Sequence, residues 1–94
     1  MIKRIVKMEF ESDKINAFMA LIELNKNKIE NSEGCISLEI LQDINNENIF
    51  FTYSCWQSEK DLNHYRKSNL FKQVWSKTKT YFSSKPSAWS VKFI

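Results

Sequence analysis

The sequence is poor in glycine and proline, in the histidine and cysteine that bind metals, and in long apolar segments. Its 94 residues include one glycine, one proline, one histidine and two cysteines. No stretch stays apolar long enough to span a bilayer, and the basic N-terminus MIKRIVKMEF lacks the apolar core of a secretory signal. We therefore expect a protein without a membrane segment, located in the cytoplasm.

Cofactor and nucleic-acid signatures are missing as well. One histidine and two cysteines give no spacing typical of a closed metal site, and a single glycine cannot form the dinucleotide-binding pattern G-x-G-x-x-G. The 14 Lys and Arg residues give a net charge of +3 but are scattered along the chain. No segment presents the basic surface that a nucleic acid needs. We expect no metal, no cofactor and no nucleic-acid partner.

Large apolar side chains, in contrast, are abundant. Hydrophobic residues make up 43% of the chain and aromatic residues 14%, which is too much for a disordered protein. The length fits a single domain over residues 1–94. A chain of this size buries only roughly 60 to 70% of its unfolded surface, so a partner subunit would add stability.

The first third of the chain predicts a strand and a long helix. Residues 2–10 alternate between apolar and polar positions, as a half-buried strand does. From Ile15 onward, apolar residues recur at spacings of three, four and seven, which indicates an amphipathic helix. We expect Ser12 or Asp13 to cap this helix and Gly34 to end it, because glycine adopts a left-handed conformation without strain.

The rest of the chain predicts a hairpin, a broken helix and a last strand. The runs 35–43 and 48–56 are rich in β-branched and aromatic residues and flank a turn-forming segment. A serine followed three residues later by an acid predicts a capped helix over about 59–67. Two cap-type residues at 68–69 predict a break before the helical stripe resumes, and alternation in 88–94 predicts the last strand.

The register of the hairpin stays open. One register places Cys35 opposite Cys55, and a turn centred on Asn45-Asn46 places Cys35 opposite Trp56 instead. In either case we expect both thiols to be reduced and buried.

The order β-α-β-β-α-β predicts an α+β protein of the ferredoxin-like type, in which two helices cover one face of a four-stranded antiparallel sheet. The strand over 48–56 carries apolar residues on both of its faces. Helices can cover only one side, so we expect the other side to meet a second subunit in a homodimer.

The middle of the chain carries a recognisable set of residues at the ends of the predicted strands and the starts of the predicted helices: Gly34, Cys35, Asp43, Trp56, Ser58, Glu59, His64, Ser68 and Phe71. This set resembles the antibiotic-biosynthesis-monooxygenase-like family of small dimeric α+β barrel proteins. The resemblance implies a homodimer with a pocket between sheet and helices in each subunit. Relatives include cofactor-free oxygenases of phenols and quinols, and haem-degrading enzymes. Val74 and Trp75 stand where the haem-degrading relatives carry a histidine, so haem degradation is not expected.

Seven residues are candidates for the site. His64 is the natural general base, because histidine is the side chain whose ordinary pKa lies near neutrality; its structural alternative is a hydrogen-bonded helix residue. Trp56 could stack on a flat substrate and donate its indole N–H to a substrate oxygen, or simply pack the end of its strand. Thr52 offers a polar group where some relatives carry Asn. The other candidates for binding a substrate are aromatic: Tyr53, Tyr65, Phe71 and Trp75.

The resemblance thus implies a cofactor-independent monooxygenase that acts on a small aromatic phenol or quinol. The alternative is a dimer of the same fold that binds a small molecule, or serves a stress response, without catalysis. Fold alone does not separate these two functions.

Overall fold

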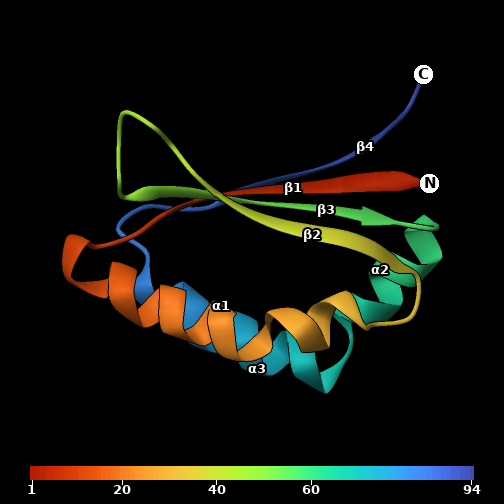
Figure 1. Ribbon diagram of the computed structural model, residues 1–94, viewed down its shortest axis with the longest axis horizontal. Coiled ribbons are helices and arrows are strands. Elements are labelled where there is room, and N and C mark those ends of the chain that lie inside the picture. Colours follow the sequence, from red (N-terminus) through yellow and green to blue (C-terminus); the bar gives the residue numbers. More distant parts are fainter.

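The computed structural model describes all residues 1–94 and consists of a four-stranded antiparallel sheet with helices on one face (Figure 1). The strands are β1 (Ile2–Glu9), β2 (Cys35–Gln42), β3 (Ile49–Trp56) and β4 (Ser87–Lys92). Their order in the sheet is β2-β3-β1-β4, with β1 and β3 in the middle. The predicted ferredoxin-like α+β architecture is confirmed.

The helices are α1 (Ile15–Glu30), α2 (Glu59–Arg66) and α3 (Asn69–Thr78), and α1 packs alongside α3 beneath the sheet (Figure 1). None of them combines the length and the apolar character needed to cross a bilayer. Two expectations for α1 are wrong. It ends at Glu30, before Gly34, and it begins after a 3-10 turn without a side-chain cap from Ser12 or Asp13.

Gly34 lies in the turn that leads into β2, and it has the positive φ of 81° expected for a left-handed residue. A Cβ atom at this position would overlap the side chain of Asp61 in α2. The only glycine of the chain is thus required twice, for its backbone conformation and for the close approach of α2. That approach holds the start of α2 against the end of the sheet.

The predicted cap and break around α2 are confirmed. Ser58 Oγ accepts a hydrogen bond of 3.2 Å from the backbone N–H of Asp61 at the start of α2. Ser68 Oγ accepts one of 3.1 Å from the N–H of Phe71 at the start of α3. Two separate helices therefore replace one long helix, and the change of direction brings Tyr65 of α2 edge-to-face with Phe71 of α3.

The hairpin follows neither predicted register throughout. Cys35 lies opposite Trp56, as in the second alternative, but a β-bulge follows and places Ser37 opposite Cys55. No disulfide forms between the two cysteines. Cys55 is buried, whereas Cys35 is only partly buried, so the expectation that both thiols are buried is wrong for Cys35.

The core lies between the helices and the half of the sheet nearest to the hairpin turn. Its buried members are Met8, Phe10, Phe18, Ile22 and Phe50. The rings of Phe10 and Phe18 stack with their centroids 4.3 Å apart, and Phe50 meets both rings edge-on. Burial of each of these side chains contributes about 1.5–3 kcal/mol.

No helix covers the face of the sheet turned away from α1, α2 and α3 (Figure 1). It carries the side chains that alternate with those facing the helices. Trp89 and Val91 of β4 and Leu41 of β2 are between 42% and 48% exposed. This uncovered apolar face is what the sequence predicts from the pattern of the strand over 48–56.

Candidate functional site

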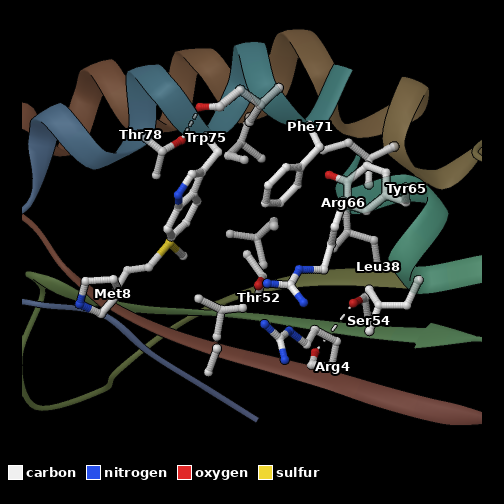
Figure 2. Close-up of a pocket in the computed structure, with 18 of the residues that line it drawn as sticks. Arg4, Met8, Leu38, Thr52, Ser54, Tyr65, Arg66, Phe71, Trp75 and Thr78 are labelled. Carbon is white, nitrogen blue, oxygen red and sulfur yellow. Dashed lines mark hydrogen bonds between the residues drawn. The ribbon is translucent and has the colours of Figure 1, made fainter. Parts of the chain in front are cut away.

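A cavity of about 340 Å³ lies between the helix-facing side of the sheet and helices α2 and α3 (Figure 2). Of the 21 residues that line it, 14 are hydrophobic. Its volume falls in the range of about 300–1,000 Å³ that is typical of small-molecule pockets, as does its mostly apolar lining with a few polar groups. The cavity has room for a ligand of one or two rings.

A continuous row of aromatic rings forms one wall. Trp56 of β3 stacks on Tyr65 of α2 with ring centroids 5.0 Å apart. Tyr65 meets Phe71 edge-on at 5.3 Å, and Phe71 lies nearly parallel to Trp75 at 6.0 Å (Figure 2). These distances are those of favourable aromatic pairs, and the wall presents flat surfaces.

Trp56 is the buried end of this aromatic row, on the sheet. Only 1% of its surface is exposed, and its indole N–H donates a hydrogen bond of 3.0 Å to Ser54 Oγ. The predicted donation of this N–H to a substrate oxygen is therefore replaced by a bond within the protein. In the structure, Trp56 stacks on Tyr65 and packs under α2.

The hydroxyl of Tyr65 stays protonated. Burial, and secondarily the nearby Cys35 thiolate, raise the pKa of Tyr65 from 10.0 to about 12. Near neutral pH this phenol is a weak hydrogen-bond donor and cannot act as a base.

Two arginines bring positive charge into the otherwise apolar cavity. Arg4 of β1 and Arg66 of α2 both line it, and Figure 2 shows their guanidinium groups next to one another, close to Thr52. Burial and, secondarily, the positive charge of Arg66 lower the pKa of Arg4 from its ordinary value, yet Arg4 remains a cation. No Asp, Glu or His lines the cavity.

The structure brings most of the predicted ligand-contacting residues together. Five of them line the cavity: Thr52, Trp56, Tyr65, Phe71 and Trp75. Tyr53 does not, because neighbouring residues of a strand point to opposite faces of the sheet. Its ring lies on the uncovered face, where Lys3 Nζ is 4.4 Å from the ring centroid. Tyr53 is therefore placed away from the site by the same alternation that places Thr52 in it.

His64 lies elsewhere. It is exposed on α2 and borders a shallow polar depression rather than the cavity. The other residues of this depression are Glu33, Glu59, Lys60, Asp61, Asn63 and Lys67. The catalytic role that the sequence suggests for His64 stays a prediction, without a geometric link to the cavity.

The sequence reasoning missed both arginines, although each leaves a signal. Arg4 alternates with Val6 and Met8 and so shares the face of β1 that packs against the helices. Arg66 follows the buried Leu62 by four residues, which places both on one side of α2. A cation on the helix-facing side of a strand, as at Arg4, is uncommon and is a signal that sequence reasoning can use.

Residues that could hold a metal ion are not grouped anywhere in the chain. No cluster of three or more His, Cys, Asp or Glu side chains has the arrangement of a metal site. The chemistry available in the cavity itself is that of aromatic surfaces, hydroxyl groups and two cations.

The comparison with protein families decides what kind of protein this is. The family model described as antibiotic biosynthesis monooxygenase matches residues 1–76, which include β1 through most of α3. The chain belongs to the antibiotic biosynthesis monooxygenase family. The resemblance stated from the sequence is thereby confirmed.

Solved structures share the fold of this family member at low sequence identity. A conserved protein from Methanosarcina mazei is 21% identical, with a TM-score of 0.92 over 97% of this chain and 90% of that chain. A "putative antibiotic biosynthesis monooxygenase" from Nitrosomonas europaea is 17% identical, with a TM-score of 0.92 over 100% of this chain and 99% of that one. Identities at this level establish the fold alone. No curated protein matches the chain.

Proposed function

We propose that this member of the antibiotic biosynthesis monooxygenase family oxidises a small aromatic phenol or quinol in the cavity, without a cofactor. The observation that carries the proposal is the cavity of about 340 Å³ itself, with its aromatic wall from Trp56 to Trp75. Flat aromatic walls suit a flat aromatic substrate, and an apolar enclosure keeps water from a reactive intermediate. Family membership supports the same chemistry.

The reaction starts from the anion of the phenol, which is electron-rich enough to react with molecular oxygen directly. A ring carbon forms a bond to one oxygen atom, and the O–O bond of the resulting peroxide then breaks. One oxygen atom stays on the ring as a carbonyl, and the other leaves as water with the two hydrogens that the phenol loses. A phenol and one O₂ thus give a quinone and one water, with four electrons passing from the ring to oxygen.

In this cavity the substrate anion is stabilised by charge rather than formed by a neighbouring base. No side chain with an ordinary pKa near neutrality lines it, since Tyr65 is protonated and the remaining ionisable groups are Arg4 and Arg66. A guanidinium near a bound phenol lowers the pKa of that phenol, and its proton leaves to solvent. The aromatic wall holds the ring in place while oxygen attacks.

Oxygen uptake with a panel of phenols and quinols tests the proposal. We expect uptake by the metal-free protein, reduced at least tenfold, about 1.4 kcal/mol of barrier, when Val74→Phe fills the cavity. Leu24→Phe is the matched control, because Leu24 is 71% exposed on α1.

His64→Ala separates two mechanisms: a large loss of oxygen uptake would place catalysis outside the cavity, at the polar depression. No uptake with any compound would remove the proposal.

The second candidate function is a dimer that binds a small molecule without turning it over. One observation favours it, namely that no general base lines the cavity. A ligand that shifts the thermal unfolding midpoint of the protein but is recovered unchanged after incubation in air would support binding without catalysis.

We propose further that the active form is a homodimer. The uncovered apolar face of the sheet carries Leu41, Trp89 and Val91, all partly exposed. Apolar surface of this kind is stabilised when a second copy covers it, and both faces of the sheet are then buried. The cavity lies on the opposite side of the sheet, so pairing through this face leaves the site within each subunit.

A further inference from the structure

The arginines of the cavity stand out because they are the only two in the chain. Twelve of the 14 cationic side chains are lysines, and none of them lines the cavity. Arg4 comes from a central strand and Arg66 from the end of α2, so two distant segments converge on one place. Figure 2 shows that both guanidinium groups point toward the same part of the cavity.

Neither arginine is neutralised by an acid. The only salt bridge of the structure joins Lys26 and Glu30 on α1, at 3.5 Å. Arg4 donates a hydrogen bond of 3.0 Å to Ser90 Oγ of β4, which orients its guanidinium. The side chain of Arg66 has no hydrogen-bond partner within the protein and is exposed, so the end of the cavity that it borders is open to solvent.

Two cations held side by side repel each other, and the effect is stronger beside apolar walls than in water. Burial, and after it the positive charge of Arg66, lower the pKa of Arg4. An anion between the two guanidinium groups would remove this repulsion and gain charge-assisted hydrogen bonds. The planar fork of arginine suits an oxyanion better than the single ammonium of lysine does.

We propose that Arg4 and Arg66 form an oxyanion-binding subsite, and that the ligand of the cavity is an aromatic molecule with an anionic oxygen attached to or near its ring. This names the substrate class within the function proposed above and rests on the cavity being its site. The ring packs against Phe71 and Trp75 while the oxyanion, a carboxylate or a phenolate, lies between the guanidinium groups near Thr52.

Calorimetric titration with benzoate and with neutral benzamide tests the carboxylate form. We expect the protein to bind benzoate at least tenfold more tightly than benzamide, and Arg66→Gln to reduce this ratio severalfold while Arg4 retains part of it. Arg66→Gln leaves the fold intact, because Arg66 is exposed and has no partner to lose. Lys67→Gln removes the same charge from the neighbouring residue outside the cavity and should keep the preference.

Absorbance titration of bound 4-nitrophenol tests the phenolate form. We expect the bound phenol to ionise at least one pH unit below the free compound in the unsubstituted protein, and less than that in Arg66→Gln. A preference in either titration supports the subsite and identifies which oxyanion it takes. Equal affinity for benzoate and benzamide together with an unshifted 4-nitrophenol, or no binding of any of the three probes, overturns it.

These titrations need no turnover, so they fail independently of the proposed reaction. Preference for the anion without any oxygen uptake would leave the subsite in place and remove the monooxygenase proposal. Oxygen uptake that Arg66→Gln does not alter, together with no preference for anions, would keep the monooxygenase proposal and remove the subsite.

Discussion

Trp56 and Ser54 are joined by a hydrogen bond of 3.0 Å from the indole N–H to the serine Oγ, on the cavity side of β3. They are two residues apart on one strand and therefore share a face of the sheet. Ser54 Oγ in turn donates to the backbone carbonyl of Arg4 on β1, at 3.4 Å. One small hydroxyl thus fixes the base of the aromatic wall and ties it to the strand that carries a cavity arginine.

Ser54→Ala should destabilise the protein by about 1–3 kcal/mol, because the buried indole N–H of Trp56 loses its acceptor. Chemical unfolding measures this cost. Trp56→Phe in the Ser54→Ala background removes the orphaned donor, so the double variant should lose less than the sum of the two single losses. Ser76→Ala, on the exposed side of α3, is the control and should change stability little. Additive losses would contradict the pairing.

Stability should fall in alkaline solution through Tyr65. Its pKa is raised in the folded protein from 10.0 to about 12, so folding favours the protonated phenol. This contribution is fully present below pH 10 and is lost as the pH rises from about 10 to about 12, by about 3 kcal/mol. Tyr65→Phe has no proton to lose and should show a correspondingly weaker dependence. Equal slopes of unfolding free energy for both proteins over this range would show that Tyr65 is not buried as described.

Gly34→Ala should cost about 1–3 kcal/mol in unfolding free energy. The new Cβ would strain the backbone at a φ of 81° and overlap the side chain of Asp61. The start of α2 should also loosen, which amide hydrogen exchange at Asp61 and Leu62 would detect. Glu33→Ala is the neighbouring control, since its backbone has no positive φ. Unchanged stability of Gly34→Ala would refute the close approach.

Trp89→Lys should convert the proposed dimer to a monomer. Trp89 is 48% exposed on the uncovered face, and a lysine there would place a desolvated charge in the interface. Light scattering measures the mass of both proteins. Ile44→Lys is the control, because Ile44 is 96% exposed in the hairpin turn and its replacement should leave the mass unchanged. A monomeric unsubstituted protein would end the dimer proposal.

Local chemistry made much of this fold predictable. The caps at Ser58 and Ser68 act within one helical turn, and the alternation of Arg4, Val6 and Met8 follows from the geometry of a strand. Such features depend only on residues close in sequence. The left-handed conformation of Gly34 follows from its being glycine, and it is confirmed. The end of α1 at Glu30 was not predicted, because a helix can end at any of several neighbouring residues and packing decides which one.

What could not be predicted depends on contacts between distant residues. The β-bulge after Cys35 shifts the register of the hairpin by one residue, and the sequence of the hairpin turn contains no signal for this bulge. Thr52 and Tyr53 looked equally suitable for the site until the sheet showed which face the helices cover. The pairing of Arg4 with Arg66 joins the start of the chain to its second helix, a relation that spacing along the sequence does not contain.

The central position of β1 shapes how the chain can fold. Ile2 pairs with Lys92, so the two neighbours of β1 in the sheet include the strand that is most distant from it along the chain. Closing so long a loop is entropically costly, and sheets built on such distant pairs fold slowly. Without β4, β1 would be an open edge able to pair with other chains. Ser87 and Ala88 of β4 also line the cavity, so the cavity is complete only when β4 is paired with β1.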